Sequence, residues 1–266
     1  MAGERLAREE GGRVDGVILA AGLGTRLRPF TDRAPKALLE VGGVAMLERV
    51  ARRLVAAGAD RLVVNLHPFP EQVRAFVAAR GSFGTEVLFS EEREGPLETG
   101  GAILKARDLL RRDGPFVVHN VDVLTDLPIE DLLRRHRATR PLATLAVAER
   151  ASSRALLFDE AGLLGRVDRT RGIDLRVRAP RGEVTSLAFA GIHAVDPSFL
   201  DRIEERGAFS VLVPYLRLAA EGASILPYRA DAWRWCDVGR SADLTAAEEL
   251  ARALDGSPSG GRARAG

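Results

Sequence analysis

The sequence is poor in cysteine and lysine and has no long apolar run. Its 266 residues include one cysteine, Cys236, so no disulfide can form within the chain, which fits a reducing cytoplasm. No apolar stretch approaches the roughly 20 residues that cross a bilayer. The first residues, MAGERLAREEGGR, lack the apolar centre of a secretory signal. We therefore expect a cytoplasmic protein that does not insert into a membrane.

An excess of charge of one sign is also missing. The chain has 39 basic and 37 acidic residues, and they are interspersed. Without a basic stretch, neither a nucleic acid nor a membrane surface is an expected partner, and an anionic ligand must be bound at a local site. Only two of the basic residues are lysines, Lys36 and Lys105. A lysine inside a motif therefore stands out.

Apolar runs alternate with helical patterns along the first half of the chain. The pattern predicts strands over 14–21, 61–66, 86–90 and 116–121, and helices over 46–55, 71–79 and 101–112. Such alternation predicts a Rossmann-like α/β fold with a mostly parallel mixed sheet flanked by helices.

The second half of the chain has a different sequence pattern. It predicts strands over 143–148, 154–158, 184–195 and within 224–237, and helices near 197–221 and over 242–254. These strands indicate an antiparallel β addition to the same sheet. We predict one domain over residues 14–255, with flexible tails at residues 1–13 and 256–266.

A glycine-rich loop follows the first predicted strand. It reads Leu19-Ala-Ala-Gly-Leu-Gly-Thr-Arg-Leu-Arg-Pro-Phe-Thr31, and Ala34-Pro-Lys36 comes shortly after it. Gly22 and Gly24 allow a sharp bend and expose N–H groups to phosphate oxygens. Arg26 adds a planar charged group that suits phosphate, and Lys36 adds a compact charge. The loop therefore predicts a phosphate site.

Three interpretations of this loop compete. A plain strand–helix turn needs the glycines only for tight packing. A dinucleotide loop is disfavoured because Leu27 occupies the third glycine position and no acidic residue follows the second strand near Asn65. A Walker loop is disfavoured because neither lysine follows a glycine.

The loop resembles the signature of the sugar-phosphate nucleotidyltransferases, L-A-A-G-x-G-T-R-L-x-P-x-T followed by P-K. The resemblance implies the nucleotidyltransferase fold and a reaction in which a nucleoside triphosphate and a sugar 1-phosphate give a nucleoside-diphosphate sugar and pyrophosphate. It implies catalytic roles for Arg26 and Lys36. It also implies that nucleotide is bound by the loop residues Ala20, Ala21, Gly22, Leu23, Gly24 and Thr25.

Two aspartates are the candidate metal ligands. Mg²⁺ prefers one or two carboxylates, with substrate phosphates and waters completing its shell. Asp122 follows a predicted buried strand, and Asp237 lies in Trp233-Arg-Trp-Cys-Asp-Val-Gly239. Taken alone, either aspartate could be a turn or cap residue. Both contexts resemble the family's metal-binding N-G-D and W-x-D-V-G segments, which implies that Asp122 and Asp237 bind Mg²⁺ and serve catalysis.

The chain departs from the family pattern at Val121, where the family usually has glycine before the aspartate. If that glycine makes room for the ribose, the valine is expected to change nucleotide binding, substrate choice or activity.

The resemblance also implies a base pocket and a sugar pocket. Glu98, Thr99, Gly100 and Gly101 resemble the segment that lines the nucleobase, although a capped helix start would use the same residues. Asn120 is a further expected nucleotide contact. Gly191 resembles the glycine that contacts the sugar phosphate. The family's E-K-P segment is absent, and an arginine of Arg166–Arg171 is expected to replace its lysine.

The compact length and the L-E-T-G-G segment resemble short bacterial enzymes that act on N-acetylmuramate 1-phosphate or mannose-type 1-phosphates. UTP or GTP is therefore the favoured triphosphate. A non-catalytic regulatory homologue that binds a nucleotide-sugar, a transferase that consumes one, and a cytidylyltransferase for a phospho-alcohol remain alternatives. A homo-oligomer is also left open.

Overall fold

A mixed sheet forms the centre of the structure, a computed structural model that describes residues 12–256. The tails predicted at 1–13 and 256–266 thus lie almost wholly outside the described residues. The strands are β1 Asp15–Leu19, β2 Glu40–Val41, β3 Val44–Ala45, β4 Arg61–Leu66, β5 Glu86–Glu91, β6 Phe116–Asn120, β7 Val123–Thr125, β8 Ala143–Ala148, β9 Arg154–Asp159, β10 Gly162–Asp168, β11 Ile173–Arg176, β12 Thr185–Val195, β13 Ile225–Arg229 and β14 Trp235–Asp237. The α-helices are α2 Met46–Ala56, α3 Pro70–Ala79, α4 Glu98–Lys105, α5 Ile129–Thr139, α6 Leu212–Ala220 and α7 Leu244–Asp255.

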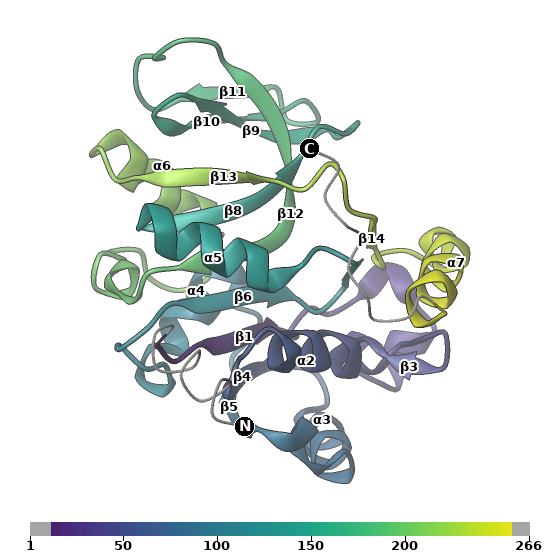
Figure 1. The fold of residues 1–266 in the computed structure, drawn as a ribbon. Helices are drawn as coiled ribbons and strands as arrows, with labels where there is room; N and C mark the ends of the chain where they lie inside the picture. The colour runs from purple at the N-terminus through teal and green to yellow at the C-terminus, as the bar shows by residue number, and fades with distance from the viewer. Residues whose placement is uncertain (1–11, 257–266) are drawn as a thin grey trace.

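The strand order of the main sheet is β11-β10-β9-β12-β6-β1-β4-β5, and β8 pairs with β12 and β13 beside this path (Figure 1). The β6-β1-β4-β5 part is parallel. Because neighbouring side chains of a strand face opposite ways, Val17 and Ile18 of β1 enter two separate apolar clusters. The sheet is therefore covered on both faces.

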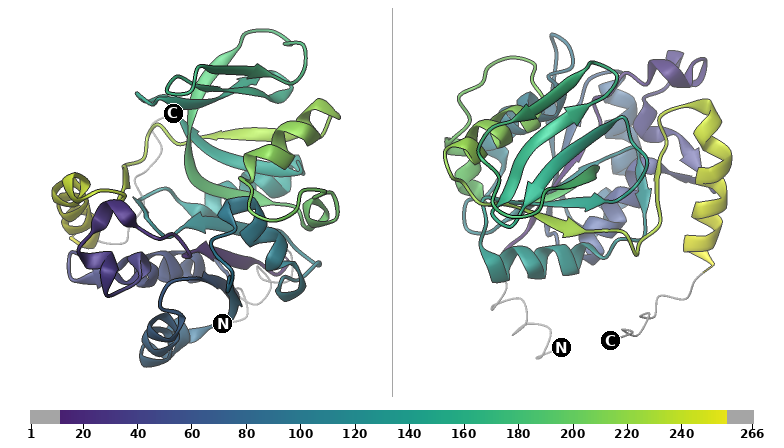
Figure 2. Two further views of the ribbon diagram at one scale, coloured as in Figure 1. Left: turned by 180° about the vertical axis from the view of Figure 1, so that it is seen from behind. Right: turned by 90° about the horizontal axis from the view of Figure 1, so that it is seen from above.

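Helices α2, α3, α5 and α7 contribute to the cluster that contains Ile18, and α4 and α6 to the cluster that contains Val17. Figure 1 shows the face covered by α2 and α5, and the reverse view in Figure 2 shows α4 and α6. In α2 the buried positions Met46, Leu47, Val50 and Leu54 recur at helical spacing. Within the described residues, no helix is both long and apolar enough to traverse a bilayer.

Strand β12 joins the two halves of the sheet. It runs antiparallel to β6, and its pairing with β8 shifts register between Phe189 and His193. At this bulge Gly191 has φ 77°, and a Cβ there would lie 2.8 Å from the Asn120 Nδ2 atom. Only glycine can make this turn so close to the end of β6.

The predicted fold class is confirmed, with corrections in detail. The helix expected over 101–112 begins earlier, at Glu98, and ends at Lys105. The region expected to be helical near 197–221 holds a 3-10 turn at Pro197–Asp201 and the short helix α6. Helix α5 and strands β2, β3, β7, β10 and β11 were not predicted. Strands β2, β3 and β7 have only two or three residues each, which is too short for a periodic pattern.

Three buried histidines make the fold sensitive to acid. Burial lowers the pKa of His193 to about 3 and the pKa values of His119 and His136 to about 4. These pKa values lie below the ordinary histidine value of 6.5. Between the lowered pKa and pH 6.5, the unfolded chain therefore binds more protons than the folded chain. Stability should therefore be lost as the pH falls from about 6.5 towards 4.

We expect His193→Gln to reduce this acid sensitivity by on the order of 2 kcal/mol, measured as the free energy of unfolding at pH 7 and pH 5. Glutamine keeps a polar atom near the Tyr215 hydroxyl, which lies 3.1 Å from His193 Nδ1. His67→Gln, at a half-buried position, is the matched control. An unchanged difference between the two pH values in His193→Gln would contradict the assignment.

Candidate active site

An ion pair joins the glycine loop to the end of β6. Lys36 begins a 3-10 turn after the loop, and its Nζ atom lies 2.5 Å from Asp122 Oδ2. Lys36 is only 8% exposed, so its charge depends on this partner. The two residues are 86 positions apart in the chain, and the structure brings them together as expected for one site.

The glycine loop leaves a row of N–H groups free. Gly24 has φ 60°, and a Cβ there would lie 2.7 Å from Thr31 and 3.2 Å from Lys36. The Thr31 hydroxyl donates to the Gly24 carbonyl at 2.9 Å and closes the loop. In the described part of the chain, the N–H groups of Gly22, Leu23, Gly24 and Thr25 have no protein acceptor. Consecutive free N–H groups form a concave site for an anion.

Asp237 and Arg26 complete the charged cluster. Strand β14 pairs with β7, and the Val238 N–H donates to the Asp122 carbonyl at 2.8 Å, which holds the two aspartates side by side. A Cβ on Gly239 would lie 3.2 Å from the Arg26 guanidinium, so glycine makes room for Arg26 beside Asp237. The four predicted catalytic residues therefore meet at one place.

The pKa of Asp237 is raised. The main cause is protein that displaces water around the carboxylate, and the Asp122 charge adds to it, while Lys36 and Arg26 act in the opposite direction. Two carboxylates that repel one another are a donor set that fits Mg²⁺, which typically takes one or two of them. No group of three or more histidine, cysteine or acidic side chains suited to a metal exists among the described residues.

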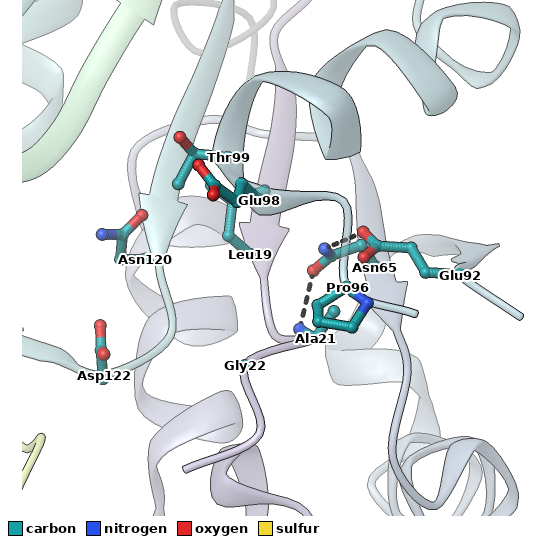
Figure 3. Close-up of a pocket in the computed structure, with 10 residues that line it drawn as sticks. All are labelled: Leu19, Ala21, Gly22, Asn65, Glu92, Pro96, Glu98, Thr99, Asn120 and Asp122. Atoms are coloured by element: carbon teal, nitrogen blue, oxygen red, sulfur yellow. Dashed lines mark hydrogen bonds between the residues drawn. The ribbon is translucent and has the colours of Figure 1, made fainter. Parts of the chain in front are cut away.

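A cavity of about 180 Å³ opens beside this cluster (Figure 3). The residues that line it come from the ends of β1, β4, β5 and β6 and from the start of α4; they are Leu19, Ala21, Gly22, Asn65, Glu92, Pro96, Glu98, Thr99, Asn120 and Asp122. Of the predicted nucleotide contacts, the cavity includes Ala21, Gly22, Glu98, Thr99 and Asn120. Its place at the carboxyl ends of parallel strands is where such sheets bind ligands.

Asn65 and Glu92 are buried polar residues of this cavity that sequence reasoning did not select. The Asn65 Oδ1 atom accepts hydrogen bonds from the N–H groups of Ala20 and Ala21, and its Nδ2 atom donates to Glu92 at 2.6 Å. Glu92 also accepts from the Leu97 N–H at 2.7 Å. This chain of bonds ties the glycine loop to the segment before α4, and Figure 3 shows its part from Ala21 through Asn65 to Glu92. In the sequence, the signal that could have indicated Asn65 was a polar residue near the end of a predicted parallel strand.

At the start of α4, Gly100 and Gly101 do not line the cavity, although the resemblance implied that they line the nucleobase. Both N–H groups donate to the Phe209 carbonyl, at 2.8 and 3.2 Å, because Phe209 packs directly against Gly100. The side that faces the cavity instead contains Glu98, at φ 57°, and Thr99. A left-handed non-glycine residue costs about 1 kcal/mol or more, a strain that is common at binding sites.

A second cavity has a volume of about 200 Å³. It is lined by the two sequence neighbours of Gly191, and β14 contributes Trp235. Its lining comes from β7, the end of β8, the bulge of β12 and the segment before β14; it consists of Thr125, Leu127, Ala148, Glu149, Arg150, Ala190, Ile192, Ala230, Asp231, Trp233 and Trp235. The Arg166–Arg171 segment does not line it. Arg169 there donates to the Ser152 carbonyl at 2.8 Å.

Val121 is placed in the core. It is 3% exposed, its N–H donates to the Leu19 carbonyl at 3.1 Å, and its side chain belongs to the apolar cluster under α2. The side chain is absent from the residues that line the first cavity. The added bulk that the sequence led us to expect near the ribose thus lies in the packed interior.

This fold, with free N–H groups, two carboxylates and two cations at the strand ends, defines a nucleotide-binding α/β protein equipped for phosphoryl transfer. The chain belongs to the nucleotidyl transferase family, whose profile matches residues 15–163.

Two relatives illustrate the similarity. The chain is 36% identical over 213 residues to the N-acetylmuramate alpha-1-phosphate uridylyltransferase of Caulobacter vibrioides. The aligned residues cover 77% of this chain and 84% of that protein. It is 37% identical over 195 residues to the mannose-1-phosphate guanyltransferase of Gibberella zeae, which covers 72% of this chain. The match spans only 52% of the Gibberella zeae protein.

Solved structures share the fold at low sequence identity. The inositol-1-phosphate CTP transferase from T. maritima matches with a TM-score of 0.72 and 16% identity, covering 92% of this chain and 98% of that one. The UDP-glucose pyrophosphorylase from Acinetobacter baumanii matches with a TM-score of 0.72 and 18% identity, covering 92% and 95%.

We expect Val121→Gly to lower the free energy of unfolding by about 2–4 kcal/mol, because it removes a buried side chain and frees the backbone. The Michaelis constant for the triphosphate should change less than twofold, since the side chain does not face the cavity. Val17→Gly is the stability control, because Val17 is a buried residue of β1 that packs in the other apolar cluster, on the opposite face of the sheet. A selective change in triphosphate affinity in Val121→Gly would place the residue in the nucleotide site after all.

The two aspartates should respond oppositely to removal of charge. Asp122→Asn leaves the buried Lys36 without its partner and should cost about 1–3 kcal/mol. Asp237→Asn should leave the metal-free protein equally or more stable at pH 8, because the raised pKa means that folding disfavours the ionised form. Thermal unfolding with a chelator measures both effects. An equal decrease in the thermal midpoint of Asp122→Asn and of Asp237→Asn would contradict the electrostatics described for the two aspartates.

Proposed function

We propose that the chain is a magnesium-dependent nucleotidyltransferase that joins a nucleoside triphosphate to a sugar 1-phosphate and releases pyrophosphate. The observation that carries this proposal is the Lys36–Asp122 ion pair placed beside the free N–H groups of Gly22–Thr25. Family membership and the activities named for the relatives support it. We also propose a cytoplasmic location.

In this proposal the chain works by position and charge. The loop N–H groups and Arg26 hold the β- and γ-phosphates, and Lys36 faces the α-phosphate. Mg²⁺ held by Asp122 and Asp237 would supply positive charge that offsets the charge of the phosphates. The sugar phosphate oxygen is already an anion, so no side chain needs to remove a proton. This oxygen forms a bond to the α-phosphorus, and the bond from that phosphorus to the β-phosphate oxygen breaks.

For the substrates, we propose UTP or GTP with an N-acetylmuramate-type or mannose-type 1-phosphate, by analogy with the named relatives. A regulatory homologue would bind these ligands without turnover. The cluster of Arg26, Lys36, Asp122 and Asp237 favours an enzyme, because binding alone does not require two repelling carboxylates near a buried lysine.

A matrix of four triphosphates against several sugar 1-phosphates and phosphocholine, with pyrophosphate release measured, tests the proposal. We expect release with at least one sugar 1-phosphate, only when Mg²⁺ is present and a chelator is absent. Release with phosphocholine alone would favour the cytidylyltransferase alternative. Ligand binding without any release would favour the regulatory alternative.

Lys36→Ala should lower turnover by about a hundredfold or more, because a charge that stabilises the transition state is lost. Lys105→Ala is a control made possible by the scarcity of lysine: it removes the other lysine, which is exposed on α4. Circular dichroism checks that both variants fold. Turnover of Lys36→Ala within threefold of the Lys105→Ala value would remove Lys36 from the mechanism.

A further inference from the structure

The second cavity lies next to the first cavity and to the proposed metal site. Ala190 and Ile192, which flank Gly191, line it, and Gly191 itself lies against Asn120 of the first cavity. Trp235 lines it from β14, two residues before Asp237. Side chains two apart on a strand share a face, so the cavity and the proposed metal site lie along one face of β14.

Arg150 is the one cationic side chain among the described residues that line this cavity. Its Nη2 atom donates to the Phe189 carbonyl at 2.8 Å, and its guanidinium carbon lies 3.3 Å from the centre of a Trp235 ring. The Trp235 indole is itself fixed, because its N–H donates to the Ala190 carbonyl at 2.9 Å. Arg150 is therefore held in a defined orientation by groups on both sides.

One nitrogen of this guanidinium has no partner. Among the described residues, Arg150 Nη1 is buried and makes no hydrogen bond. A buried donor without an acceptor is costly, so the arrangement favours a ligand that supplies one. Burial lowers the pKa of Arg150, and the charge of Asp237 opposes that effect, which indicates that the two groups are close enough to interact. An anion at Nη1 would thus lie near the proposed metal site.

We propose that Arg150 binds the phosphate of the sugar 1-phosphate. This inference rests on the proposed function and identifies a substrate-binding residue for it. The phosphate bound in this way is the group that attacks the triphosphate, and after transfer it is the sugar-linked phosphate of the product. Arg150 provides the cation that the absent E-K-P segment would otherwise supply, and it lies two residues after β8 rather than in Arg166–Arg171.

Arg150→Ala tests the inference in the full-length chain. We expect the Michaelis constant for the sugar 1-phosphate to rise about ten- to a hundredfold, the usual effect of losing a hydrogen bond between charged groups. In the reverse direction, the Michaelis constant for the nucleoside-diphosphate sugar should rise in parallel. The constants for the triphosphate and for pyrophosphate should stay within twofold.

Two further variants separate binding from a purely structural role. Arg150→Lys keeps the charge and should recover part of the affinity. Arg166→Ala removes a half-buried arginine of the alternative segment and should leave all four constants unchanged. The thermal midpoint of unliganded Arg150→Ala should fall only slightly, because one hydrogen bond and one ring contact are lost, while the rise in midpoint on adding sugar 1-phosphate should shrink.

The inference is overturned if Arg150→Ala and Arg150→Lys both leave the sugar 1-phosphate constant unchanged, or if Arg166→Ala raises it instead. It is also overturned if Arg150→Ala raises the constants for all substrates together with a lower thermal midpoint. These results differ from a failure of the proposed function, in which wild type releases no pyrophosphate with any pair of substrates.

Discussion

The ion pair between Lys36 and Asp122 is the interaction on which the site depends. It joins two segments that are far apart in the sequence, the turn after the glycine loop and the end of β6. Because Lys36 is buried, the pair fixes where its charge lies before any substrate binds. The free N–H groups, Asp237 and Arg26 are useful only because this pair sets the position of the loop against the sheet.

Several groups around the pair are left unsatisfied within the protein itself. Within residues 12–256, the N–H groups of Gly22–Thr25 lack acceptors, Arg150 Nη1 makes no hydrogen bond, and Asp122 and Asp237 repel one another. Each of these is unfavourable alone and becomes favourable when an anion or a cation binds. Such local costs are concentrated at functional sites, where the surrounding sheet is stable enough to bear them.

The sequence predicted the elements that carry strong local patterns. The parallel strands, the glycine loop and the four charged residues follow from apolar runs and from motifs of fixed spacing, and the structure brings them together. Asn65, Glu92 and Arg150 were not selected, because none of them belongs to a motif of fixed spacing. For Asn65 the weaker signal was a polar residue at the end of a parallel strand. Gly100 and Gly101 were expected to line the nucleobase, whereas their N–H groups bond to the Phe209 carbonyl. Val121 was expected to affect nucleotide binding if it lay near the ribose, whereas its side chain packs in the core.

The scarcity of lysine allows a direct test of the central ion pair. In protein labelled with ¹⁵N at the lysine side chains, only Lys36 and Lys105 give ammonium signals, and Lys105→Arg assigns them. Adding Mg²⁺ and a non-hydrolysable triphosphate is expected to shift the Lys36 signal, because the partner of Lys36 changes from Asp122 to phosphate, and to leave the Lys105 signal unmoved. A Lys36 signal that does not respond while the triphosphate is bound would contradict this expectation.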